Sequence, residues 1–234
     1  MSNELKYLEI AITEVCNLNC KACSHFSPLA NAGDRVTPEK FRADIRRMKE
    51  LFPVIFTIRL LGGEPLMHDD WAEMAHYVRR LYPKSHVTIV TNGLLIPQIS
   101  VEKLDLIAQD NIEFDISLYK PTAAFRDTIE GVCAAHGIKR RYTDPIETFR
   151  VRFDPAGNHD VAISYRDCVI GKACTYLYNG MLSGCPAPNT IHLYNRSFGT
   201  SISGKEDLID IHNTTMSAQE ILKKLRTELT VCRY

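Results

Sequence analysis

The first two thirds of the chain alternate short apolar segments with longer amphipathic ones. The short segments are rich in β-branched and aromatic residues, which favour strands, whereas the longer ones repeat apolar residues at helical spacing. Such an alternation predicts βα units around a parallel sheet. We expect strands over residues 8–15, 54–61, 86–91, 112–118, 138–142 and 149–153.

Residues that commonly start helices lie between these predicted strands. Thr37 can cap a helix whose first residue is Pro38, and Ser100 can cap another that runs toward Ala108. A further helix is expected over residues 123–136, because Gly137 is a natural left-handed stop. Parallel βα units connect by right-handed crossovers, so the predicted fold is α/β, a partial (β/α)6 TIM-like barrel. Its ligands should lie at the carboxyl ends of the strands.

The alternation stops near Asp154, and prolines and glycines are frequent in the residues that follow. We therefore expect two parts, a barrel core over residues 1–153 and a small cysteine-rich C-terminal module over residues 154–234. The last helix of that module should begin at Ser217, because Ser217 and Glu220 have the spacing of a capping box.

Composition narrows the classes of partner and compartment. Lysine plus arginine and aspartate plus glutamate each number 28, so the formal net charge of zero gives no reason to expect a nucleic-acid or anionic-membrane partner. The first residues lack a secretory-signal pattern and no apolar run reaches membrane-spanning length, so we expect a cytoplasmic protein. In that reducing compartment, the eight cysteines favour metal or redox chemistry over disulfides.

Three of these cysteines directly follow the first predicted strand. Cys16, Cys20 and Cys23 form a C-x3-C-x2-C motif in one short loop. A [4Fe-4S] cubane normally takes four thiolates, so a loop with three leaves one iron free to bind another molecule. The alternative is a zinc site with His25 as the fourth ligand, a reading that does not account for the motif after the second strand.

That second motif is Gly62-Gly63-Glu64-Pro65. Together with the cysteine motif, it closely resembles the radical S-adenosylmethionine (radical SAM) superfamily. The resemblance implies that the three cysteines hold a [4Fe-4S] cluster whose free iron binds S-adenosyl-L-methionine, and that one electron splits this cofactor to release a 5′-deoxyadenosyl radical. It also implies an electron donor of the flavodoxin or ferredoxin type.

The same resemblance assigns residues to the S-adenosylmethionine site. The glycine motif would present acceptors to the methionine ammonium group, and Asn92 and Ser117 would line the same rim, with Ser117 as a ribose-binding hydroxyl. The cofactor-binding residues are thus expected to be Gly62, Gly63, Glu64, Pro65, Asn92 and Ser117. The family often has an aromatic residue just before the third cysteine, where this chain has Ala22.

Four more cysteines lie in the C-terminal module, namely Cys168, Cys174, Cys185 and Cys232. Four thiolates complete a cubane. The glycines before Cys185, together with Cys174, resemble the hairpin of twitch or SPASM modules, which implies an auxiliary [4Fe-4S] cluster. The alternative is that some of these thiols are only small buried side chains, which is what we expect for Cys133 in its predicted helix.

An auxiliary cluster with four thiolate ligands can accept an electron from a substrate radical. We therefore expect a radical SAM oxidoreductase. The compact chain with one auxiliary module resembles the small twitch-type dehydrogenases, which implies dehydrogenation of a small sugar-like or aminocyclitol-like molecule. Epimerisation and cross-linking, including modification of a peptide substrate, stay open, and a non-catalytic iron–sulfur electron carrier is the alternative of another class. Arg141 and Arg152, on the last predicted strands, are candidate contacts to an anionic or hydroxylated substrate.

Overall fold

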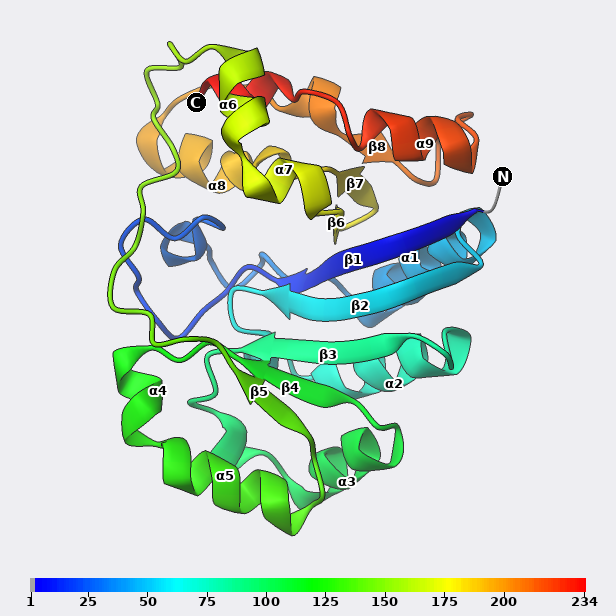
Figure 1. Ribbon diagram of the computed structural model, residues 1–234, viewed down its shortest axis with the longest axis vertical. Helices are drawn as coiled ribbons and strands as arrows, with labels where there is room; N and C mark the ends of the chain where they lie inside the picture. The colour runs from blue at the N-terminus through cyan, green and yellow to red at the C-terminus, as the bar shows by residue number, and fades with distance from the viewer. Residues whose placement is uncertain (1–2) are drawn as a thin grey trace.

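A single mixed sheet runs through the computed structural model, which describes residues 3–234 (Figure 1). Its strands lie in the order β5-β4-β3-β2-β1-β6-β7-β8. The pairs from β5 to β6 in this order are parallel, whereas β7 pairs antiparallel with both β6 and β8. The sheet is open, as expected for a partial barrel. The strands are β1 (Glu4–Thr13), β2 (Val54–Gly62), β3 (His86–Thr91), β4 (Glu113–Ile116), β5 (Arg140–Tyr142), β6 (Tyr176–Tyr178), β7 (Met181–Ser183) and β8 (Ile209–Asp210).

Helices connect and cover these strands, and Figure 1 shows α1, α2 and α3 on one face of the sheet. The α-helices are α1 (Pro38–Leu51), α2 (Trp71–Leu81), α3 (Val101–Gln109), α4 (Lys120–Ala124), α5 (Arg126–Ala135), α6 (Val161–Asp167), α7 (Val169–Ala173), α8 (Ala187–Phe198) and α9 (Ala218–Lys224). Short 3-10 helices are η1 (Ser27–Leu29), η2 (Pro65–Met67), η3 (Ile96–Gln98), η4 (Lys205–Asp207) and η5 (Thr230–Arg233). None of the helices within residues 3–234 is long and apolar enough to cross a membrane.

The predicted helix starts are confirmed. The hydroxyl of Thr37 accepts a hydrogen bond from the Lys40 amide at 3.3 Å, and Pro38 is the first residue of α1. Ser217 and Glu220 form both hydrogen bonds of the capping box that opens α9. The helix α3 also begins directly after Ser100, although this side chain makes no capping hydrogen bond.

The core lies between the sheet and the helices on that face. In α1, Phe41, Ile45 and Met48 are buried at helical spacing, and they meet buried residues of β1 and β2 such as Leu8 and Ile58. Each of these side chains contributes about 2 kcal/mol by leaving water. This packing holds the strands in place, so that their carboxyl ends can carry a site.

One predicted strand is wrong, and one predicted helix differs in detail. Residues 149–153 are not a strand, because the chain leaves the sheet after β5 and Pro145 has no amide hydrogen for a strand partner. The sixth parallel strand is instead β6, which joins the opposite side of the sheet beside β1. The helix expected over residues 123–136 is divided into α4 and α5 at Phe125, and Gly137 follows α5 with a φ of +66°.

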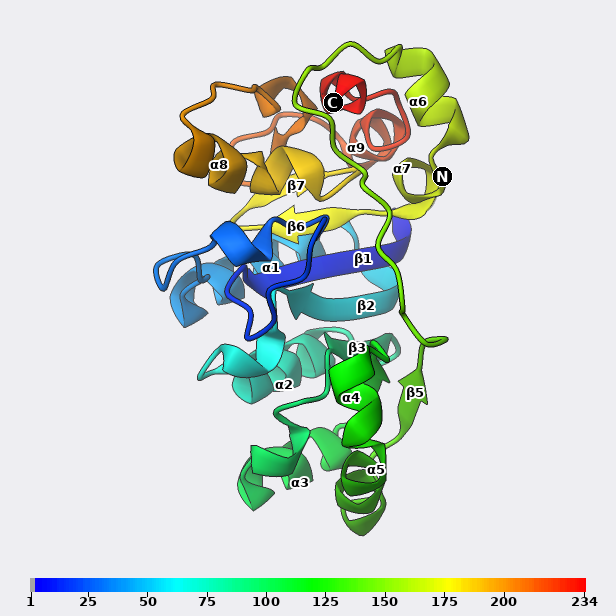
Figure 2. The same cartoon turned by 90° about the vertical axis from the view of Figure 1, so that its left-hand side faces the viewer.

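The segment of residues 143–160, which we call the connecting segment, links β5 to α6. Figures 1 and 2 show it passing the ends of the central strands on its way to the C-terminal helices. The strands β6, β7 and β8 that follow continue the same sheet. The division of the chain between residues 153 and 154 into two domains stays a prediction.

Ion pairs attach the C-terminal part to the first part. Arg196 of α8 donates to both carboxylate oxygens of Asp34, at 3.1 and 2.6 Å, and to the carbonyl of Leu29. Hydrogen bonding from Arg196 lowers the pKa of Asp34 below its ordinary value of 3.8. At another contact, His212 Nε2 lies 2.6 Å from Oδ1 of Asp44 on α1.

Substitution of Arg196→Gln should lower the free energy of unfolding by about 1 kcal/mol at neutral pH, because a bidentate ion pair is lost. The pKa of Asp34 is lower in the folded state, so this stabilisation is present above pH 3.8 and is lost as the pH falls below it. The difference between wild type and variant in urea unfolding should therefore shrink on acidification. Arg80→Gln, an exposed arginine of α2, is the control, and an equal difference at all pH values would contradict the assignment.

Candidate active site

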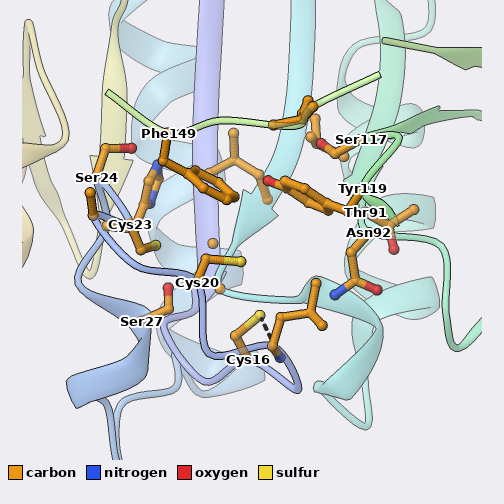
Figure 3. Close-up of a pocket in the computed structure, with 18 of the residues that line it drawn as sticks. Cys16, Cys20, Cys23, Ser24, Ser27, Thr91, Asn92, Ser117, Tyr119 and Phe149 are labelled. Carbon is orange, nitrogen blue, oxygen red and sulfur yellow. Dashed lines mark hydrogen bonds between the residues drawn. The ribbon is translucent and has the colours of Figure 1, made fainter. Parts of the chain in front are cut away.

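A cavity of about 540 Å³ lies at the carboxyl ends of the central strands. Its walls come from the loop after β1, the Gly62-Gly63 turn, the ends of β3 and β4, and the connecting segment. Figure 3 shows Cys16, Cys20 and Cys23 on one side of it, with Phe149 and Tyr119 across from them. The cavity therefore lies where a partial barrel is expected to bind its ligand.

The three cysteines of the first motif all line this cavity and are partly exposed. Burial, together with the nearby charges of Glu64, Cys23 and Cys20, raises the pKa of Cys16 to about 11, against a hydrogen bond from the Leu18 amide at 3.4 Å. A cationic centre between the three cysteines would stabilise the Cys16 thiolate, and three thiolates are the donor set of an iron–sulfur cluster with one open iron. Within residues 3–234, no three His, Cys, Asp or Glu side chains are arranged to hold a single metal ion.

The glycines of the second motif are required by the backbone of β1. A Cβ atom on Gly62, whose φ is +144°, would lie 1.8 Å from the carbonyl oxygen of Thr13, and one on Gly63 would lie 2.4 Å from those of Glu14 and Val15. Both residues also line the cavity. The sequence indicated a close approach to a ligand, and the structure adds a close approach to the end of β1.

Glu64 is fully buried beneath the cavity wall and does not line it. Its carboxylate accepts hydrogen bonds from the Thr91 hydroxyl at 2.6 Å, the Asn92 amide at 2.8 Å and the Leu66 amide at 3.1 Å. Burial raises its pKa to about 7, although these hydrogen bonds act in the opposite direction. The carboxylate therefore connects β2 to the end of β3, and Pro65 begins η2 directly after it.

Asn92 and Ser117 both line the cavity at the ends of β3 and β4. Asn92 Nδ2 donates to Oδ1 of Asn17, in the cysteine loop, at 2.7 Å. The Ser117 amide donates to the carbonyl of Thr91 at 2.9 Å, which brings these two strand ends together. Figure 3 shows both side chains on the side of the cavity opposite Cys23.

A network of charged side chains lies on the inner face of the sheet, and our sequence reasoning missed it. Glu9 of β1 and Arg59 of β2 are register partners, and both line the cavity. Arg59 Nη1 lies 3.4 Å from Glu9, and Nη2 donates to Asp115 of β4 at 2.6 Å. Arg59 gave a signal in the sequence, because it is the one charged residue of the apolar strand β2.

The two arginines proposed as substrate contacts lie in different places. Arg141 of β5 donates to the same oxygen of Asp115 at 2.6 Å, is largely exposed and does not line the cavity. Arg152, on the connecting segment, does line it.

His25 also lines the cavity. Its Nδ1 lies 3.2 Å from the hydroxyl of Tyr176 and 3.7 Å from Oε2 of Glu14, which is fully buried. Burial alone would lower the pKa of His25, but the Glu14 carboxylate outweighs it and raises the pKa. Since Glu14 directly follows β1 and Tyr176 belongs to β6, this contact also joins the two parts of the chain.

The C-terminal cysteines lie near one another but make different contacts. Cys168, between α6 and α7, accepts a hydrogen bond from the Gly171 amide, and Cys232 lies in η5. Burial raises the pKa of Cys185 to about 12, and its neighbours Cys168 and Cys232 raise it as well. The buried thiol of Cys174 donates to Glu9 at 3.2 Å, and burial, followed by the charge of Glu9, raises its pKa. Cys133 is fully buried in α5, as expected.

Substitution of Glu64→Gln should remove a pH-dependent component of stability. The folded-state pKa of about 7 exceeds the ordinary value of 4.5, so the stability linked to Glu64 is full below pH 4.5 and is lost as the pH rises through 7. Urea unfolding from about pH 4.5 to about pH 8 should show this decline in wild type and not in the variant. Glu228→Gln, which changes an exposed carboxylate, should behave like wild type, and parallel curves for wild type and Glu64→Gln would contradict the expectation.

The fold is similar to that of BtrN. A crystal structure of BtrN in complex with AdoMet and 2-DOIA gives a TM-score of 0.58 at 16% sequence identity, covering 100% of this chain and 93% of BtrN. A crystal structure of BtrN in an open conformation gives a TM-score of 0.57 at 13% identity, covering 98% of this chain and 91% of that one. At these identities the likeness concerns the fold alone.

Sequence similarity points to the same superfamily. The chain is 28% identical over 166 residues to a probable GTP 3′,8-cyclase of Methanothermobacter marburgensis, covering 69% of this chain and 53% of that protein. It is 35% identical over 117 residues to molybdenum cofactor biosynthesis protein 1 of Bos taurus, covering 47% and 17%. The chain thus spans about half or less of the length of these relatives. Residues 10–143, more than half of the chain, match the family model described as Radical SAM superfamily. The resemblance seen in the cysteine and glycine motifs is therefore confirmed, and the chain belongs to the radical SAM superfamily of enzymes.

Proposed function

We propose that this radical SAM enzyme dehydrogenates a small sugar-like or cyclitol-like molecule in the cavity at the ends of β1–β4. The observation that carries the proposal is the position of the two cysteine groups. The three cysteines of the first motif line that cavity, and cysteines of the second group lie close behind them. A radical-generating centre in the first cavity and an electron acceptor beside the second one would then be neighbours, because Cys20 and Cys23 line both cavities.

The residues at the cavity fit the cofactors of the superfamily. Cys16, Cys20 and Cys23 would hold the [4Fe-4S] cluster, and S-adenosylmethionine would bind beside it. Bound there, the cluster and S-adenosylmethionine would supply the radical chemistry that removes one hydrogen atom from the substrate. Gly62, Gly63, Asn92 and Ser117, which line the cavity, are proposed to position the cofactor directly. Glu64 and Pro65, which do not line it, are proposed to act through the backbone they support. An external donor of the flavodoxin or ferredoxin type would deliver the starting electron.

A second cavity of about 540 Å³ supports an auxiliary cluster. It is lined by Cys20 and Cys23 from the first group and by Cys168 and Cys185 from the second. Together with Cys174 and Cys232, the second group offers four thiolates, a complete set for a [4Fe-4S] cluster. Such a cluster would supply an acceptor for one electron from the substrate radical, and loss of that electron together with a proton to water would leave a carbonyl group on the substrate.

Glu9 and Arg59, which line the first cavity and form its floor, favour a hydrophilic substrate. Both side chains project from the middle of their strands, and ion pairs fix their positions. Carboxylate and guanidinium groups in fixed positions can order the hydroxyl groups of a sugar or cyclitol. This floor is the reason to prefer a small hydroxylated molecule over a peptide.

The relatives named GTP 3′,8-cyclases favour a second candidate, cyclisation of a nucleotide. The match to the Methanothermobacter protein covers 69% of this chain. Incubation of the reconstituted enzyme with S-adenosylmethionine, a reductant and GTP distinguishes the two candidates. Conversion of GTP to a cyclic product would support the second candidate and overturn dehydrogenation.

Cysteine substitutions test the proposal. Replacing Cys16, Cys20 and Cys23 by alanine should abolish 5′-deoxyadenosine formation after anaerobic reconstitution and reduction, because the cluster loses its ligands. Replacing Cys174 and Cys185 by alanine should leave some 5′-deoxyadenosine but remove oxidation of the substrate. Products are measured by liquid chromatography and mass spectrometry, and iron and sulfide are counted in each protein.

Cys133→Ala is the matched control, because Cys133 is buried in α5 away from both cavities. It should keep the iron content and both activities of wild type. If the Cys174 and Cys185 variants keep the full iron content and full substrate turnover, the auxiliary cluster is wrong. If the wild-type protein makes no 5′-deoxyadenosine, the whole proposal is wrong.

A further inference from the structure

Two guanidinium groups line the first cavity without a protein partner. Arg150 and Arg152 both belong to its wall, and neither makes an ion pair or hydrogen bond with any residue in the part of the chain that is described, residues 3–234. Their charges are therefore available to a molecule in the cavity.

The other charged groups of the cavity wall are compensated. Arg59 lies 3.4 Å from Glu9 and 2.6 Å from Asp115, and Glu9 is the one carboxylate among the described lining residues. The uncompensated positive charge of the wall is thus concentrated on the connecting segment. An anion in the cavity would be attracted to this side rather than to the floor.

Contacts on both sides hold the connecting segment over the cavity. The Ile146 amide donates to the carbonyl of Leu118 at 2.9 Å, and the ring of Phe149 stacks on Tyr119 at a centroid distance of 5.8 Å. At the other end, Phe153 packs edge-on against Phe26 and Tyr194. Figure 3 shows Phe149 and Tyr119 together at the cavity.

The two arginines lie close together in the sequence, are both exposed and line the same cavity. They can therefore act on one group in that cavity. Guanidinium groups present paired donors that match the oxygens of phosphate and carboxylate groups.

We propose that Arg150 and Arg152 bind an anionic group of the substrate, a phosphate or a carboxylate. The inference rests on the proposed function in placing the substrate in this cavity, and it narrows the substrate class to phosphorylated or carboxylated sugars or cyclitols. An aminocyclitol, which carries positive charge, is disfavoured at this wall. The carboxylate of S-adenosylmethionine is the competing anion, so the test is made with the cofactor bound.

The test is calorimetric titration of the full-length, cluster-reconstituted protein, saturated with S-adenosylmethionine, with four probes. They are glucose 6-phosphate, glucuronate, glucose and glucosamine, which differ in charge on a similar ring. At least one anionic probe should bind about tenfold more tightly than glucose or glucosamine, a difference of about 1.4 kcal/mol. The tighter of the two anionic probes identifies the group as phosphate or carboxylate.

The double variant Arg150→Gln with Arg152→Gln should lose this preference, whereas Arg80→Gln, an exposed arginine of α2 outside the cavity, should keep it. Arg150→Lys with Arg152→Lys keeps the charge without the paired donors and should retain part of the preference. Circular dichroism checks that each variant folds, and if the glutamine double variant does not, the two single glutamine variants replace it.

Equal binding of the four probes to wild type would overturn the inference, as would a preference that survives in the glutamine variants. A preference seen only without S-adenosylmethionine would also overturn it, because the arginines would then serve the cofactor. These outcomes leave dehydrogenation intact, since the cysteine variants test it separately. Conversely, anion binding that depends on the arginines would stand even if substrate oxidation did not depend on Cys174 and Cys185.

Discussion

At the end of β1, the turn that follows β2 lies against the β1 backbone at a distance that leaves no room for side chains. The Gly63 amide donates to the carbonyl of Thr13, and the Glu64 amide donates to that of Val15, each at 2.8 Å. Any Cβ atom on Gly62 or Gly63 would overlap these carbonyl groups. Because Cys16 follows Val15 directly, this contact sets where the cysteine loop leaves the sheet, and the cavity is built around that loop.

Glu64 extends the same constraint across the sheet. Its buried carboxylate joins β2 to the last residue of β3 and to Asn92, which in turn contacts Asn17 in the cysteine loop. Hydrogen bonds among backbone groups and short side chains thus hold one wall of the cavity together. The opposite wall, the connecting segment, is held by aromatic packing and by backbone hydrogen bonds near its two ends, and it carries the cavity's unpaired charges.

Pairing with β1, the strand that leads into the cysteine loop, positions the C-terminal part of the chain. The Glu9 amide of β1 donates to the carbonyl of Thr175 at 2.8 Å, and this pairing of β6 with β1 places Cys174 against the Glu9 side chain. Glu9 therefore lies between the cavity, the charged network of Arg59 and the second cysteine group. Contacts from Arg196 and His212 hold this part against the first one at other points.

Local features of the sequence determined a large share of this picture. The strand at residues 86–91 was predicted to the residue, and the starts of α1, α3 and α9 followed from their capping residues, because caps and periodicity act within a few positions. The superfamily was likewise recognisable, since both motifs are short and contiguous. Contacts between distant residues were decided only by the tertiary structure. Residues 149–153 make aromatic contacts and form no strand, and the Glu64 carboxylate accepts a hydrogen bond from Thr91. Asp115 pairs with Arg59 and Arg141. These partners are distant in the sequence, so the choice among them depends on how strands and loops meet in space.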